Sequence, residues 1–183
     1  EEFGEELGEQ YLRFYGRGFA PGYQDDFDAR FAVLDIQNLL ARSNPERLGL
    51  YLYRGPGDTG DRLRLRIYHP AEPLPLSDVL PVLENLGLRV ATERAYRLRC
   101  GDGSQVWIQD FNLAYALADD IELERVAEEF DDAFTRIWYG EAESDAFNRL
   151  LLGSRLSWRE IALLRAYARY LRQLNFPFRT DYI

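Results

Sequence analysis

The clearest pattern in the chain is a strict alternation of apolar and positively charged residues in its middle third. The apolar members are Leu63, Leu65 and Ile67. The charged members are Arg62, Arg64 and Arg66. Because successive side chains of a strand point to opposite faces, residues 62–68 are predicted to form a strand whose aliphatic face lies in the core beneath a helix. If the arginine face also carries Tyr or Trp, another unit or domain could cover it.

The segments around this strand predict the remaining elements of an α+β unit. They are a strand at 48–53, a turn at 55–60, a helix at about 77–86 and two strands at 88–99 and 105–113 joined by a turn at 101–103. Ser77 is the expected cap of the helix, Pro81 falls in its first turn and Gly87 ends it. This order of elements, followed by a further helix, is typical of an antiparallel α/β sandwich.

Helical patterns flank this unit on both sides. Before it, a loose helix from Glu2 to Arg17 is ended by a loop at 18–22, and Asp26 or Asp28 is expected to cap a second helix that stops at 43–45. After it, the expected elements are an amphipathic helix through 123–138, a short helix at 146–152 and a final helix opened by a Ser157–Glu160 capping box. The apolar face of the final helix is expected to anchor it through Ile161, Leu164, Ala168 and Leu171.

Composition narrows the choice of function without naming one. The chain has 183 residues, a net charge of -9 and neither Met nor Lys. The missing Met leads us to expect an interior piece of a longer protein, and the missing Lys means that this piece can use no lysine in catalysis. The acidic balance disfavours nucleic acid as a partner, and no apolar run has the ~18 residues of a membrane helix. A single cysteine favours a reducing, cytoplasmic location.

No residue set in the sequence has the spacing of a catalytic, cofactor or metal site. His69 and Cys100 are the only residues of their types, whereas zinc needs three or four such ligands. The glycines at 16–22 lack the spacing of a dinucleotide loop, and the acids at 119–145 lack that of a calcium loop. We therefore assign no catalytic, cofactor-binding or metal-binding residue.

A basic stripe on the final helix is the one candidate interface. Arg165, Arg169 and Arg172 recur at helical spacing, and could bind an anion or pair with carboxylates. Residues 119–145, with 11 acids against 2 arginines, favour pairing, either with that segment or with a domain outside the chain. Exposed pairs of this kind contribute ~0.2–1 kcal/mol each, so the stripe is expected to set orientation more than stability.

Two long segments resemble a known enzyme family. Residues 138–150 (WYGEAESDAFNRL) and 156–173 (LSWREIALLRAYARYLRQ) are similar to the region ahead of the catalytic domain in the large bacterial NAD-specific glutamate dehydrogenases. Residues 83–90 and Asp110–Phe111 also resemble that family. The resemblance covers roughly Leu48 to Ile183 and implies the last ACT-like domain of the regulatory region, with an ACT or ferredoxin-like α+β fold.

The resemblance also implies a division of labour. Residues 1–46 would be a helical segment, 47–118 the ACT-like core and 119–183 a helical segment leading to the catalytic domain. The parent would convert L-glutamate, NAD and water to 2-oxoglutarate, ammonia and NADH. This piece would bind no cofactor and would contact the catalytic domain and other ACT-like units of a homo-oligomer. The alternative is an amino-acid-sensing ACT module.

Overall fold

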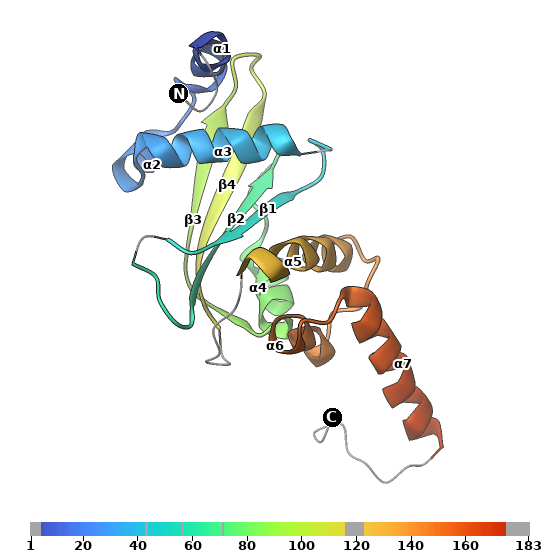
Figure 1. Cartoon of the computed structure of the whole chain (residues 1–183). Coiled ribbons are helices and arrows are strands. Elements are labelled where there is room, and N and C mark those ends of the chain that lie inside the picture. The colour runs from blue at the N-terminus through green and yellow to red at the C-terminus, as the bar shows by residue number, and fades with distance from the viewer. Residues whose placement is uncertain (1–4, 43, 56, 71, 116–122, 175–183) are drawn as a thin grey trace.

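A four-stranded antiparallel sheet forms the centre of the molecule. The computed structural model describes residues 5–42, 44–55, 57–70, 72–115 and 123–174 (Figure 1). The strands are β1 (Gly49–Tyr53), β2 (Arg62–His69), β3 (Leu88–Arg99) and β4 (Gln105–Tyr115), in the order β1-β2-β4-β3. Helix α4 (Leu76–Asn85) connects β2 to β3, and β4 lies antiparallel between these two strands. This split β-α-β connection is the ferredoxin-like arrangement, which confirms the predicted α+β fold.

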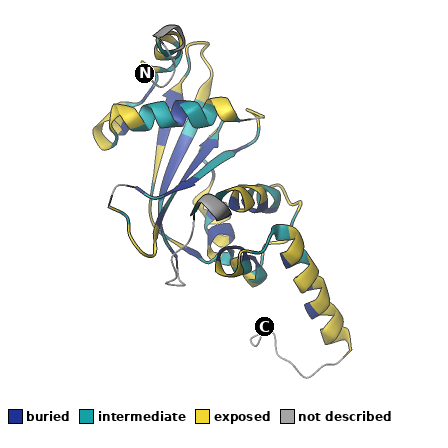
Figure 2. Ribbon diagram, in the orientation of Figure 1, coloured by how far each residue is buried: buried dark blue, intermediate teal, exposed yellow. Residues whose placement is uncertain are grey.

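One face of the sheet carries a core made of hydrocarbon. Leu63, Leu65 and Ile67 are at most 1% exposed and lie in one cluster with residues of α4 and of α5 (Leu123–Trp138). Phe130 and Phe134 of α5 are completely buried there. The two central strands, β2 and β4, accordingly appear dark blue along their middle in Figure 2. The predicted register of β2, with its aliphatic face beneath helices, is confirmed.

The opposite face is covered by helix α3 (Ala29–Ala41), which crosses the sheet (Figure 1). Asp28, rather than Asp26, caps this helix by accepting hydrogen bonds from the amides of Arg30 and Phe31. A second buried cluster lies between α3 and the sheet: Phe19, Tyr23, Ile36, Tyr68, Tyr96, Leu98 and Ile108. We considered another domain as the element that covers the arginine face of the sheet. Around Arg66, the N-terminal helices of the same chain cover that face instead.

The structure corrects three local expectations in the first half of the chain. Helix α1 spans Glu5–Tyr15, but a short helix α2 (Pro21–Asp26) replaces the end of the predicted loop, because Pro21 at its start already has a helical φ. Helix α4 is capped at Pro75 instead of Ser77, since the Pro75 carbonyl accepts the first helical hydrogen bonds. Pro81 consequently lies beyond the first turn of α4.

The hairpin turn and the C-terminal helices follow the sequence prediction closely. The amide of Cys100 donates to the Ser104 carbonyl (2.8 Å), and Gly103 has the positive φ (85°) that this tight turn requires. After α5 come a 3-10 turn η1 (Ala146–Arg149), α6 (Leu150–Ser154) and α7 (Trp158–Gln173). Ser157 and Glu160 form the predicted capping box at the start of α7.

Helix α7 projects away from the body of the molecule (Figure 1). Its contacts with the body run through Ile161, Arg165 and Ala168, which are buried. Leu164 and Leu171, which we expected on the same anchoring face, are 39% and 37% exposed. The predicted anchoring face is therefore wrong for these two leucines, because the helix carries a second apolar stripe on another side.

Candidate functional site

A buried ionic cluster lies between α3 and the sheet, centred on Arg66. Arg66 is inaccessible to solvent, its Nη1 donates to Asp35 of α3, and its Nε donates to Asp110 of β4 (3.1 Å). The hydroxyl of Tyr68 donates to Asp35 (2.7 Å), and that of Tyr53 donates to Asp110 (3.0 Å). The guanidinium of Arg66 thus binds two carboxylates, and the hydroxyls of Tyr68 and Tyr53 stabilise the remaining negative charge by hydrogen bonding to them.

Aromatic rings and carboxylates together keep Arg66 charged. Its guanidinium carbon lies 4.3 Å from the ring centre of Phe27 and 5.0 Å from that of Phe31, so ring faces replace water around the cation. Burial alone would lower the pKa of Arg66, but Asp35 and Tyr53 outweigh it and raise that pKa. Burial also raises the pKa of Tyr53, which therefore remains a protonated donor.

The geometry of this cluster fits a structural connection better than catalysis. Arg66 and Asp35 are both 0% exposed, so neither can reach a substrate in this conformation. Asp35 comes from the N-terminal helices, whereas Arg66 and Asp110 come from adjacent strands. Removing one partner of such a buried pair costs several kcal/mol, because the other charge is left without compensation. The cluster therefore fixes which helix covers this face.

A second ionic cluster holds α7 against the body. Arg165 donates from Nε and Nη2 to the two carboxylate oxygens of Asp145 (2.7 and 2.8 Å), and its Nη2 also donates to Asn148 (2.8 Å). Asp145 accepts from the amide of Phe147 and caps η1. The hydrogen bonds from Arg165 lower the pKa of Asp145. The carboxylate of Asp145 thus caps η1 and also binds Arg165 of α7.

The three arginines of the predicted basic stripe have different environments. Arg165 is buried, which corrects the expectation of exposed pairs: its charge is held within the fold by Asp145. Arg169 is half exposed and pairs with Glu143. Arg172 is exposed and forms no ion pair with the described residues. Two of the three arginines therefore meet carboxylates of the 119–145 segment, as the charge pattern indicated.

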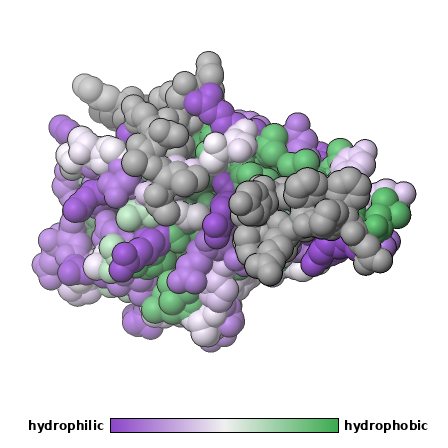
Figure 3. All heavy atoms as spheres, turned by 90° about the horizontal axis from the view of Figure 1, so that it is seen from below, coloured by the Kyte–Doolittle hydropathy of each residue, from purple (hydrophilic) through white to green (hydrophobic). Residues whose placement is uncertain are grey.

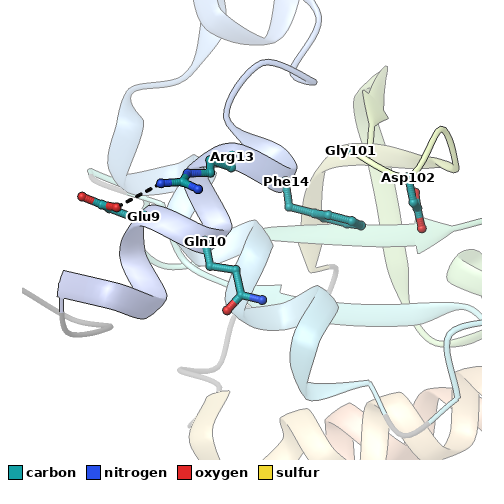
Figure 4. A pocket seen from close by; sticks show the side chains of 6 residues that line it. All are labelled: Glu9, Gln10, Arg13, Phe14, Gly101 and Asp102. Carbon is teal, nitrogen blue, oxygen red and sulfur yellow. Dashed lines mark hydrogen bonds and ion pairs between the residues drawn. The ribbon is translucent and has the colours of Figure 1, made fainter.

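An open groove lies between α1 and the turn that joins β3 to β4 (Figure 4). Its volume is about 620 Å³, and its lining consists of Glu9, Gln10, Arg13, Phe14, Gly101 and Asp102. Arg13 and Glu9 pair with each other across one helical turn (3.4 Å) and are largely exposed. The charged groups of the groove are therefore in contact with water and already partly compensated.

The lone histidine and cysteine lie apart in ordinary structural settings. His69 Nδ1 lies 2.9 Å from the carbonyl oxygen of Glu72, at the end of β2. Cys100 is partly buried beside the hairpin turn, and burial raises the pKa of its thiol. Within the described residues, no group of three or more His, Cys, Asp or Glu could hold a metal ion. No described helix is both long and apolar enough to cross a membrane.

Sequence analysis missed the Arg66 cluster. The alternation placed Arg66 on the face opposite the hydrocarbon core, but it did not show what covers that face. The available signal was Asp35, which lies between Leu34 and Ile36 in an otherwise apolar helical stretch. An acidic residue at such a position must be paired when it is buried, and three arginines on one strand face were the obvious partners.

Curated proteins similar to this chain share one description. The chain is 46% identical to the NAD-specific glutamate dehydrogenase of Halomonas elongata and 46% identical to that of Pseudomonas aeruginosa, in each case over 183 residues, 100% of this chain and 11% of the relative. It is 41% identical to that of Mycobacterium tuberculosis over 113 residues, 59% of this chain and 7% of the relative. The chain thus spans about a tenth of the length of the curated relatives that it matches.

The fold and its flanking helices define an ACT-like α+β unit held between two helical segments. Three family models match successive parts of the chain, namely glutamate dehydrogenase helical motif 2 at 1–41, the glutamate dehydrogenase ACT3 domain at 47–126, and glutamate dehydrogenase helical motif 3 at 142–183. The chain belongs to the NAD-specific glutamate dehydrogenase family.

Proposed function

We propose that this chain is a regulatory and scaffolding segment of an enzyme that oxidises L-glutamate with NAD and water to 2-oxoglutarate, ammonia and NADH. The observation that carries the scaffolding role is that helices cover both faces of the sheet. The names of the relatives support the activity of the parent. In this reading NAD binds to the parent outside the chain, and the chain contributes no catalytic residue.

The division of the chain follows from the same proposal. Residues 1–46 act as a helical segment, 47–118 as the ACT-like core, and 119–183 as the helical segment that leads to the catalytic domain. The matches to helical motifs on either side of an ACT3 domain support this division. We further propose a cytoplasmic, oligomeric parent that takes part in amino-acid catabolism, in which the segment contacts the catalytic domain and other ACT-like units.

Enzyme assays test this proposal directly. The full-length parent should form NADH in the presence of glutamate and NAD, whereas the 183-residue chain should neither form NADH nor bind NAD. NADH formation by the purified chain would overturn the assignment of catalysis to the rest of the parent. A full-length protein without glutamate-dependent NAD reduction would overturn the proposed activity.

Amino-acid sensing is the competing function. The described groove at α1 has charges of both signs, as an amino-acid site requires, but Glu9 and Arg13 there are solvated and paired with each other. That pairing favours scaffolding. Titration calorimetry with a panel of amino acids separates the two functions, because scaffolding predicts no heat of binding at millimolar concentrations of any of them.

A further inference from the structure

Helix α7 carries an apolar stripe that faces away from the body. Six large side chains recur with steps of three and four residues, which places them on one side of a helix: Leu163, Leu164, Tyr167, Tyr170, Leu171 and Leu174. Leu163, Tyr167, Tyr170 and Leu174 are between 55% and 59% exposed. In the view from below, hydrophobic surface appears at the end of the molecule where α7 projects (Figure 3). None of the described elements buries this stripe.

The stripe is distinct from the side of α7 that holds the helix in place. Ile161, Arg165 and Ala168 are buried against the body, and Arg169 is occupied by Glu143. Arginines at 165 and 169 are therefore used inside the described chain and are not available to a partner. The surface left over for a partner is the Leu and Tyr stripe, whose composition is typical of an interface because tyrosine combines a large apolar ring with a polar end.

We propose that this stripe is the docking surface for an amphipathic helix of the same parent polypeptide, from a region outside these 183 residues. The proposal rests on the proposed function, since it takes the chain to be a segment of a much longer protein. The relatives support this length, because the chain covers 11% of each of the two that match it throughout. The partner helix would present an aliphatic face to the stripe.

Area favours a partner in the same polypeptide over a second copy of α7. The six side chains expose on the order of 600 Å² of surface. A stable interface between separate proteins buries about 800 Å² on each partner. The stripe by itself is therefore small for a dimer, whereas a helix in the same chain is held at a high effective concentration and needs less contact area to stay bound.

Photo-cross-linking in the full-length parent tests the proposal. Tyr167 is replaced by p-benzoylphenylalanine, and in a matched control Arg172, which lies on another side of the same helix, is replaced instead. After irradiation, position 167 should cross-link to an apolar helical segment outside residues 1–183 without doubling the mass on a denaturing gel. The yield should exceed that of the control at least tenfold. A cross-link between two polypeptides, or a yield no higher than the control, would overturn the proposal.

Hydrogen exchange supplies a second measurement. It distinguishes loss of a docked partner from a destabilisation of α7 itself, because the latter would occur in the 183-residue chain as well. In the full-length parent, the double variant Tyr167→Gln/Tyr170→Gln should speed amide exchange along α7 by tenfold or more, and Arg172→Gln should leave it unchanged. In the 183-residue chain the same double variant should leave exchange unchanged, because the stripe is already uncovered. Equal acceleration in both proteins would overturn the docking role. Neither readout needs activity, so a parent inactive on glutamate would overturn the proposed function alone.

Discussion

On one face of the sheet, Leu63, Leu65 and Ile67 meet the apolar side chains of α4 and α5, whereas on the other face Arg66 meets Asp35 of α3. Hydrocarbon packing is non-directional and tolerates changes that keep the volume. A buried arginine between two carboxylates accepts only a helix that brings a carboxylate to one place. The apolar side chains of one face therefore pack without selecting a particular partner, whereas Arg66 on the other face selects the helix that covers it.

Removing the buried cation of Arg66 should change the free energy of unfolding more than any other substitution considered for the two faces. Arg66→Met leaves Asp35 and Asp110 buried without their cation, so the free energy of unfolding should fall by about 3–5 kcal/mol. Urea denaturation of the 183-residue chain measures this loss. The double variant Arg66→Met/Asp35→Leu should recover part of it, because one of the uncompensated charges is gone. A single variant that costs less than about 1 kcal/mol would contradict the selective role of the ionic face.

A cavity on the hydrocarbon face should lower the free energy of unfolding by a smaller amount, and removing Asp35 on the other face should not restore that loss. Leu65→Ala removes a completely buried side chain, so we expect a loss of about 3 kcal/mol in the same denaturation experiment. Adding Asp35→Leu to this variant should not restore stability, since the two sites lie on opposite faces. Recovery in this double variant would show that the faces are coupled through the sheet.

The Asp145–Arg165 contact should contribute less and should depend on pH. Asp145→Asn keeps a residue that can cap η1 but removes the charge, so we expect a loss of about 1 kcal/mol at pH 7. The native pKa of Asp145 is lowered by Arg165, so its contribution is complete above the ordinary aspartate value of about 3.9. That contribution is lost as the pH falls through the lowered pKa. The difference between wild type and variant should therefore shrink towards pH 3, and a difference that grows on acidification would refute this account.

The smallest effect is expected at the free end of the basic stripe. Arg172 is exposed without an ion pair among the described residues, so Arg172→Gln should change the free energy of unfolding by less than about 0.5 kcal/mol. Thermal unfolding at low and at high salt measures this. Arg165→Gln is the matched comparison and should cost clearly more, because Arg165 is buried against Asp145 and Asn148.

The strands, their register and the capping box of α7 could be predicted from the sequence because each depends on local spacing. Alternation alone placed Leu65 and Arg66 on opposite faces, and Ser157 three residues before Glu160 fixed a helix start. The partner of Arg66 depends on a contact between residues 31 positions apart, which no local pattern specifies.

The two apolar stripes of α7 show a different limit. Leu164 and Leu171 have the same helical spacing as Ile161 and Ala168, so the sequence groups all four on one broad face. Burial separates them, since only part of that face meets the body. Periodicity identifies the apolar positions of a helix, but the extent of the neighbouring elements decides which of them become a core and which stay available for an interface.

The cover on both faces of the sheet also has a mechanical consequence. The N-terminal helices are fastened to one face through Arg66 and Asp35, and α5 is fastened to the other through Phe130 and Phe134. A shift of one helical segment relative to the other must therefore bend the sheet or break one of these contacts. Because close-packed protein interiors have low compressibility, we infer that the sheet transmits a displacement of one helical segment to the other.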